Sequence, residues 1–177
     1  MEKLRETFID ELRDILDAEK QLTRALPKMA KAAENEDLRD GFEEHLEQTE
    51  QHITRLEEVF KLLNEPARGK KCLAMQGLVK EGEEIIEDEA GDAALICAAQ
   101  KVEHYEIATY GSLVAWGRRL GEDEAVSLLE ETLQEEKDTD ERLTEIAESH
   151  INAEETEQDN EEETQEPRRG TKPKATR

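Results

Sequence analysis

One stretch of the chain decides its fold, and it reads LICAAQKVEHYEIATYGSLVAWGRRLG from Leu95 to Gly121. Its apolar residues recur every three or four positions, which predicts an amphipathic helix. The stripe consists of Leu95, Ala99, Val102, Glu106, Thr109, Tyr110, Leu113 and Trp116. Glu106 stands in the middle of this stripe, with Glu103 one turn before it. Two carboxylates on a face that should be buried indicate a polar site inside the fold.

Three further segments show the same helical period, so the chain is predicted to be all-α. They cover about residues 4–33, 35–63 and 122–149. Asn35 is expected to cap the second of these helices, because an Asn side chain accepts a hydrogen bond from the first helical turn. Pro27, inside the first helix, should kink it or end it early.

The connections between these helices predict how they pack. The turns near residues 34 and 121 are short, so each flanking pair of helices should form an antiparallel hairpin. The connection from Asn64 to Gly91 is long, and its segment from Cys72 to Ile86 should form a short helix. Two antiparallel hairpins joined by one long crossover are the topology of a ferritin-like four-helix bundle.

The composition changes near residue 152. Residues 152–177 contain no large apolar side chain, and an acidic run from Glu154 to Glu166 precedes a basic end from Arg168 to Arg177. Such a segment cannot bury enough apolar surface to become ordered. We therefore expect a ferritin-like domain over residues 1–151 and a disordered tail over residues 152–177, which composition favours as a solubilising segment without a specific partner.

The net charge of the chain is −23, from 24 basic and 47 acidic residues. Such an acidic chain is not expected to bind nucleic acid, except through its basic tail end. It contains no apolar run long enough to span a membrane and no apolar signal segment at its start, so we expect a cytoplasmic protein. The acidity suits either a salt-rich cytoplasm or the attraction of Fe(II).

Polar residues interrupt the apolar stripes of the other helices as well, and they are Glu19, Thr49, His52, Glu136 and Asp140. Folding the two hairpins at their turns places Glu19 beside His52, and Glu106 opposite Glu136. Any one of these residues alone is more simply read as a solvated flank of its helix. Several buried carboxylates at one level need cations, because burying an unpaired charge is costly. Their mixed oxygen and nitrogen ligands suit iron or manganese.

Five motifs resemble the YciE/YciF family of bacterial ferritin-like stress proteins. They are AEKQL from Ala18, HLEQT from His45, CLAMQGL from Cys72, AAQKVEHYEIATYG from Ala98 and LQEEKDTD from Leu133. The resemblance covers residues 4–148 and implies a ferritin-like domain that is usually dimeric and linked to stress. The wider superfamily, which includes rubrerythrin and bacterioferritin, binds two irons or manganeses through one Glu from each of two helices and Glu-x-x-His from the other two.

By position, Glu19 and Glu136 resemble the superfamily ligands of the first and fourth helices, and Glu103 with Glu106 the paired carboxylates of rubrerythrin. The chain departs from the pattern twice. Thr49 stands where a bridging Glu is expected, and Thr139 where a His is expected, with Asp140 as the nearest substitute. The resemblance therefore implies one firmly bound metal ion or two weakly bound ions.

The predicted metal ligands are Glu19, His52, Glu103, Glu106, Glu136 and Asp140, supported by Thr49 and Tyr110. His45 is interpreted as a satisfied histidine between helices, and no catalytic side chain is assigned. We expect a homodimeric protein whose two Fe or Mn ions act on peroxide, dioxygen or Fe(II), in iron oxidation or peroxide detoxification. The alternatives are a non-catalytic dimeric stress or interaction protein with a degenerate metal site, and iron storage, which the lack of a clear fifth helix disfavours.

Overall fold

The computed structural model describes residues 1–153, and over these residues it contains only helices. They are α1 (Glu2–Ala32), α2 (Glu36–Leu62), α3 (Leu73–Glu87), α4 (Asp92–Leu120) and α5 (Asp123–Ile146), followed by a short π-helix, η1 (Ala147–Ile151). The predicted all-α class is confirmed. The predicted tail falls almost entirely on residues 154–177, which lie outside the described residues.

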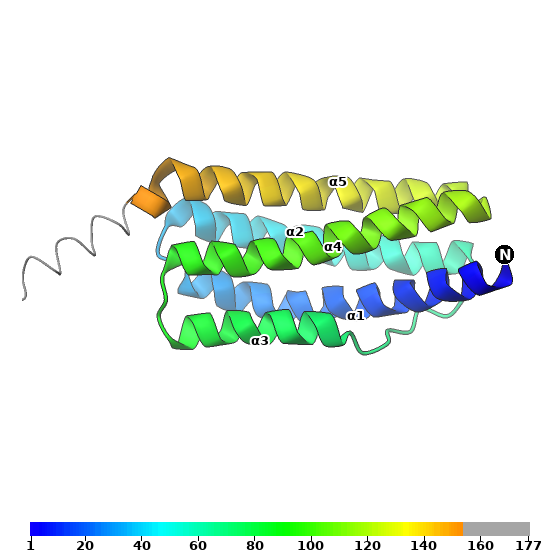
Figure 1. The fold of residues 1–177 in the computed structure, drawn as a ribbon, viewed down its shortest axis with the longest axis horizontal. Coiled ribbons are helices and arrows are strands. Elements are labelled where there is room, and N and C mark those ends of the chain that lie inside the picture. Colours follow the sequence, from blue (N-terminus) through cyan, green and yellow to red (C-terminus); the bar gives the residue numbers. More distant parts are fainter. Residues whose placement is uncertain (154–177) are drawn as a thin grey trace, which may run out of the picture.

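The four long helices form the bundle, and α3 lies beside it (Figure 1). Helices α1 and α2 pack as one hairpin and α4 and α5 as the other, while α2 packs on α5 and α1 on α4. The crossover runs back along the bundle through α3, which packs on α1 and α4. As a result α2 and α4 run in the same direction, as the predicted ferritin-like topology requires.

Local chemistry at the turns fixes both hairpins. The Asn35 side chain accepts a hydrogen bond of 3.1 Å from the Leu38 amide and caps α2 as predicted. The Asp92 carboxylate at the start of α4 accepts hydrogen bonds from the Glu34 and Asn35 amides, at 3.0 and 2.7 Å. Gly121 ends α4 with a φ of +78°, a left-handed conformation that glycine adopts without strain. The hydrogen bonds to Asp92 tie the turn between α1 and α2 to the second hairpin.

Helix α1 continues through Pro27 to Ala32, so the alternative that Pro27 ends the helix early is wrong. Proline removes one amide donor from the helical ladder. Residues on both sides of Pro27 are buried, namely Leu26, Met29 and Ala30. Packing of these residues against the bundle holds the last turn in place.

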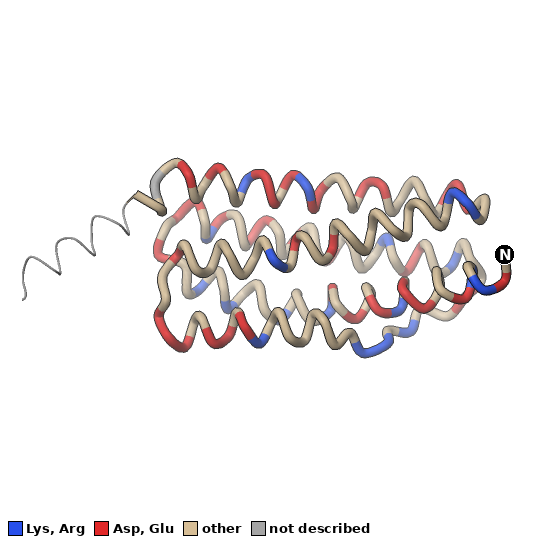
Figure 2. Tube along the Cα trace, in the orientation of Figure 1, with Lys and Arg blue, Asp and Glu red and all other residues tan. Residues whose placement is uncertain are grey.

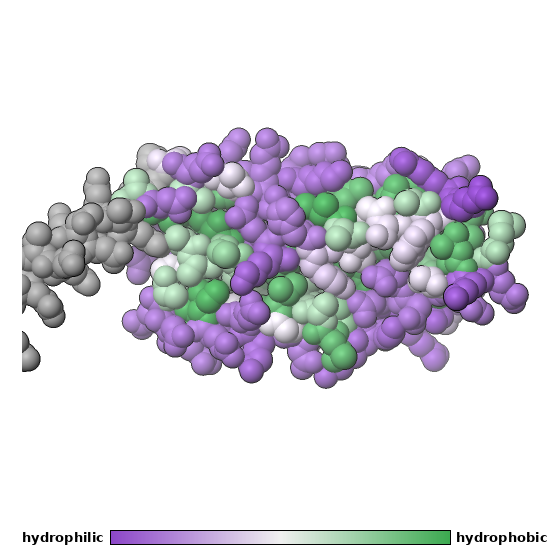
Figure 3. Space-filling model, in the orientation of Figure 1, coloured by the Kyte–Doolittle hydropathy of each residue, from purple (hydrophilic) through white to green (hydrophobic). Residues whose placement is uncertain are grey.

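The core follows the predicted apolar stripes, and its largest fully buried members are Tyr110, Phe8, Phe42, Phe60, Leu12, Ile15, Leu16, Leu22, Leu38, Leu56, Met75 and Leu113. Acidic residues occur on every helix, and basic residues lie among them (Figure 2). Hydrophilic side chains cover most of the visible face, with hydrophobic patches between them (Figure 3). Within residues 1–153, none of the helices has the length and apolarity needed to cross a membrane.

We expect Asn35→Ala to destabilise the protein by about 1 kcal/mol, because the Leu38 amide loses its capping acceptor. Asn35→Ser is the matched control, since a serine hydroxyl caps the same turn and should restore most of the loss. Urea denaturation followed by circular dichroism measures both. Equal stability of the Ala and Ser variants would show that the cap does not contribute.

Candidate metal centre

Six side chains with carboxylate or imidazole groups meet in the middle of the bundle. They are Glu19 from α1, His45 and His52 from α2, Glu103 and Glu106 from α4, and Glu136 from α5. Each is at most 3% exposed to solvent. All four long helices therefore contribute to one buried polar cluster, which we call the core cluster.

Glu136 lies at the centre of the core cluster, between the two histidines. Its Oε1 is 3.1 Å from Nδ1 of His52, and its Oε2 is 3.8 Å from Nε2 of His45. The rings of His45 and His52 are 6.3 Å apart between centroids. One carboxylate thus offers an oxygen to each side of the cluster, which is the geometry of a bridging ligand.

The first half of the cluster consists of Glu19, His52 and Glu136. Nδ1 of His52 is 3.5 Å from Oε1 of Glu19. The Tyr110 hydroxyl donates a hydrogen bond to the same Glu19 oxygen. Burial, and then the charge of Glu19, raise the pKa of Tyr110 well above its ordinary value, so the hydroxyl keeps its proton and remains a donor.

The second half consists of His45, Glu103, Glu106 and Glu136. Nε2 of His45 is 3.2 Å from Oε1 of Glu103. In each half, one ligand atom per residue lies within 4.8 Å of the ligand atoms of the others. Because Glu136 belongs to both halves, the cluster has the form of two adjacent cation sites with one shared ligand.

Most of the atoms that face the cluster lack a hydrogen bond inside the protein. Among the described residues, buried side-chain atoms without a hydrogen bond include both oxygens of Glu106 and Glu136, Oε2 of Glu19 and of Glu103, Nε2 of His45 and Nδ1 of His52. Buried polar atoms are normally paired. These atoms point at one another, and four carboxylates would balance the charge of two divalent cations. The residues therefore fit a pair of metal ions.

A second layer of charges orients His52. Its Nε2 lies 2.9 Å from Oε2 of Glu135, so that nitrogen carries the proton and Nδ1 is free to face the cluster. Glu135 is held in turn by Arg55, whose Nη2 donates to Oε1 at 2.9 Å. Burial raises the pKa of Glu135, but Arg55 and His52 outweigh it and lower that pKa. A carboxylate–histidine pair of this kind is the usual support of a metal-binding imidazole.

Without a cation, the cluster would have to hold protons. Burial, followed by the charge of Glu136, raises the pKa of Glu103 and of Glu106 well above the ordinary range. Burial lowers the pKa of His52, but Glu136 and Glu19 outweigh it and raise the value to about 10. Burial also opposes ionisation of Glu136, yet the neighbouring histidines lower its pKa. An ionised Glu136 beside a charged His52 is the stable metal-free arrangement.

The structure brings five of the six predicted ligands together and excludes Asp140. The Asp140 carboxylate contacts Gln100 at 3.2 Å and His104 at 3.4 Å, outside both halves of the cluster. Asp140 and Thr139 follow Glu136 on opposite flanks of the same face of α5, and the Asp140 flank meets Gln100 and His104 of α4 instead of the cluster. Asp140 therefore does not lie with the other predicted ligands in this arrangement.

His45 takes a place in the cluster that the sequence analysis did not give it. It lies seven residues before His52, and this spacing puts both rings on one face of α2, which was the available signal. The Tyr110 hydroxyl lies beside the cluster, where it donates to Glu19. Thr49 is fully buried, but its hydroxyl donates to the His45 carbonyl at 2.8 Å and not to a ligand carboxylate. Glu135 and Arg55 were also missed.

Comparison with known proteins identifies the family. Residues 3–156 match the profile of the family described as Domain of unknown function (DUF892). The chain belongs to this family. Protein YciF of Escherichia coli strain K12 is 48% identical over 157 residues, which cover 86% of this chain and 95% of that protein. The crystal structure of the E. coli stress protein YciF matches with a TM-score of 0.81, over 86% of this chain and 99% of the other.

Two further solved structures are similar. A protein from Rhodopseudomonas palustris, provisionally described as structural, is 44% identical, with a TM-score of 0.78 over 80% of this chain and 92% of its own. A protein from Xanthomonas campestris pv. campestris is 27% identical, with a TM-score of 0.69 over 88% of this chain and 99% of its own. These matches confirm the family resemblance and the helical bundle that the sequence predicted.

We expect the metal-free protein to lose stability as the pH rises from about 6.5 towards 10. The folded-state pKa of His52 is raised to about 10, so its stabilising contribution is complete below its ordinary value and is lost as the pH passes through the raised one. The raised pKa values of Glu103 and Glu106 act in the same direction. Urea denaturation at several pH values after chelator treatment measures the slope.

The contribution of His52 to this pH dependence is tested with its own control variant. His52→Gln should flatten the slope, whereas His104→Gln should leave it unchanged because the side chain of His104 is 69% exposed. An identical slope in His52→Gln and the wild type would contradict the assigned charge state.

We expect Glu135→Gln to weaken binding of a divalent cation by about 10- to 100-fold, because His52 loses the carboxylate that fixes its ring. Glu131→Gln is the matched control, since Glu131 pairs with the same Arg55 at 3.0 Å from an exposed position on α5. Titration with Co(II), followed by its absorption, measures the affinity. Equal affinities of the two variants would show that Glu135 does not orient the ligand.

Proposed function

We propose that this chain is a dimetal stress protein that binds two iron or manganese ions in the core cluster and uses them in peroxide removal or Fe(II) oxidation. The observation that carries the proposal is the position of Glu136, whose two oxygens face His52 and His45 and lack hydrogen bonds. The E. coli relative is named a stress protein, which supports the physiological setting.

The ligand set supports iron or manganese because both take mixed carboxylate and imidazole ligands. Glu19 and His52 would hold one ion, His45, Glu103 and Glu106 the other, and Glu136 would bridge them. Four carboxylates and two imidazoles are also the complement of the superfamily's dimetal site. Here both imidazoles come from α2, and α4 supplies two carboxylates, so the missing ligands at Thr49 and Thr139 are compensated elsewhere.

The bound metals would supply the redox chemistry: two Fe(II), each oxidised to Fe(III), would give the two electrons that with two protons reduce one hydrogen peroxide to two waters. The protein's own residues hold this chemistry in place. Tyr110 keeps one oxygen of Glu19 hydrogen-bonded, and Glu135 fixes the ring of His52. Burial of all six cluster residues excludes bulk water. The net charge of −23 favours the approach of Fe(II).

A second function is favoured by a different observation. The raised pKa values of Glu103, Glu106 and His52 favour neutral carboxyls and a charged imidazole, which lowers the buried negative charge of the cluster without a cation. A non-catalytic structural or interaction role, in keeping with the description of the R. palustris protein, would use the bundle in that state. The homodimer and the cytoplasmic location stay predictions of the sequence under both functions.

Metal loading separates the two functions. After anaerobic incubation with Fe(II) or Mn(II) and desalting, we expect about two ions per wild-type chain by mass spectrometry. Glu136→Gln should lose most of both ions, because Glu136 is shared by the two halves of the cluster. Asp140→Asn is the matched control and should keep two, because Asp140 lies outside the cluster.

The opposite outcome is equally specific. A folded wild-type chain that retains no metal would refute the dimetal function. In that case Glu106→Ala should stabilise the protein, because it removes a buried carboxylate without a partner. A metal-binding wild type should instead lose metal in this variant.

A further inference from the structure

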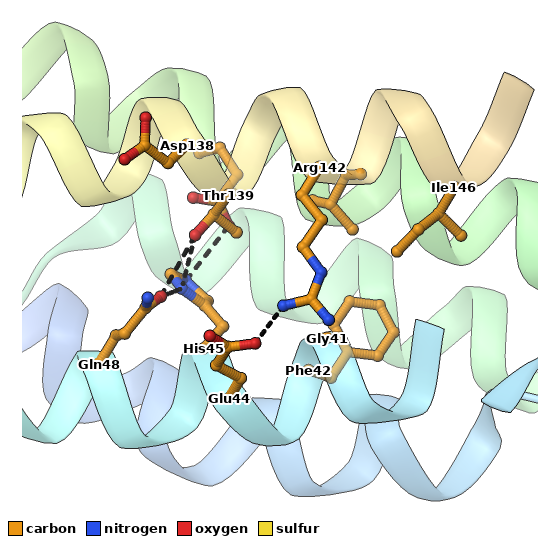
Figure 4. A pocket seen from close by; sticks show the side chains of 11 residues that line it. Gly41, Phe42, Glu44, His45, Gln48, Asp138, Thr139, Arg142 and Ile146 are labelled. Atoms are coloured by element: carbon orange, nitrogen blue, oxygen red, sulfur yellow. Dashed lines mark hydrogen bonds and ion pairs between the residues drawn. The ribbon is translucent and has the colours of Figure 1, made fainter. Parts of the chain in front are cut away.

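A pocket of about 120 Å³ opens between α2 and α5 and ends at the core cluster. Its inner wall contains His45 and Glu103, both members of the second half of the cluster. Figure 4 shows the pocket side chains of α2 and α5 facing one another across it. Three other hollows, near Met29, Arg13 and Pro27, are lined by no residue of the cluster.

We propose that this pocket admits a small neutral oxidant, hydrogen peroxide in preference to dioxygen, to the His45 side of the core cluster. The inference rests on the proposed dimetal function and adds the route and class of its substrate. It assigns Gly41 and Thr139, neither of which is a cluster residue, as the residues that keep the route open.

The His45 ring forms the boundary between pocket and cluster. Its Nε2 faces the cluster carboxylates of Glu103 and Glu136. Its Nδ1, on the pocket side, lies 3.4 Å from both the Thr139 hydroxyl and Oε1 of Gln48 (Figure 4). A molecule in the pocket therefore meets the Glu103 side chain directly and is separated from Glu136 by the His45 ring.

Thr139 makes room for the pocket. It occupies the position on α5 at which the superfamily spacing calls for a histidine ligand, and a threonine side chain is much smaller. The histidine comes from α2 instead, as His45. The exchange of a ligand between helices therefore leaves space beside the cluster. The Thr139 hydroxyl and the Gln48 amide line this space. Both groups can donate and accept hydrogen bonds, as peroxide does.

Gly41 sets the width of the outer part of the pocket. A Cβ atom at Gly41 would lie 3.8 Å from Cδ1 of Ile146, which is ordinary van der Waals contact. Alanine therefore fits at this position, whereas a longer side chain would extend into the space between α2 and α5. Gly41 and Ile146 both line the pocket.

The charges around the mouth favour a neutral ligand. Glu44 from α2 and Arg142 from α5 form an ion pair beside the opening, and Asp138 also lines it (Figure 4). Arg142 is thereby neutralised, and the chain as a whole carries a charge of −23. Anionic ligands are repelled by this field, whereas peroxide and dioxygen carry no charge.

The test narrows the pocket without touching a ligand. In the full chain loaded with Fe(II), Gly41→Leu should slow the stopped-flow reaction with hydrogen peroxide by about tenfold, as expected for an obstructed access step. Association of nitric oxide, a neutral probe read by absorption, should slow by a similar factor. Metal content should remain at about two ions per chain, because Gly41 lies outside the cluster.

Two matched controls isolate the effect of obstruction. Gly41→Ala should react at the wild-type rate, because its Cβ fits. Gly77→Leu makes the same exchange on α3, where a Cβ meets no atom within 4 Å, and should also react normally. If Gly41→Leu does not fold, Thr139→Leu obstructs the same pocket from α5 and should give the same result.

Thr139→Val distinguishes the two oxidants, because it keeps the side-chain shape and removes the hydroxyl. It should slow the reaction with peroxide more than the reaction with dioxygen. Equal effects on both would overturn the preference for peroxide. If an obstructed variant that holds two ions reacts with peroxide and nitric oxide at wild-type rates, the proposed access route is refuted and the dimetal function stands. A wild-type chain that takes up no metal would refute the dimetal function itself.

Discussion

The burial of Glu136 is the constraint on which the rest of the site depends. Its carboxylate is fully buried, neither oxygen has a hydrogen bond, and an imidazole stands on each side. Burying such a group is costly unless a positive charge is supplied. Two divalent cations would supply this charge and satisfy the other unpaired atoms of the cluster, whereas protons on Glu103, Glu106 and His52 would supply less of it.

Both histidines of the cluster come from α2, and this origin determines what lies beside the site on α5. Placing both histidines on α2 leaves α5 with a small Thr139, and this opens the pocket beside His45. The other histidine, His52, is supported from α5 by Glu135, which Arg55 holds in turn.

The sequence by itself determined the helices and the level of the site. Apolar residues at helical spacing set the four long helices, and the Asn35 cap and Gly121 set their turns. A hairpin with a short turn fixes which residues face each other, so the pairing of Glu19 with His52 and of Glu106 with Glu136 could be predicted by counting from the turns. The length of the connection before α4 was enough to predict the crossover and α3.

Only the tertiary structure decided which side chains complete the cluster. The rotation of each helix about its axis depends on packing against the helices beside it, and a change of one residue turns a side chain by about 100°. That rotation brings His45 inward, turns Asp140 towards Gln100 and His104, and places Glu135 against α2. Counting along a hairpin gives the level of a residue but not its direction, so contacts between α2 and α5, which belong to different hairpins, could not be predicted from the sequence.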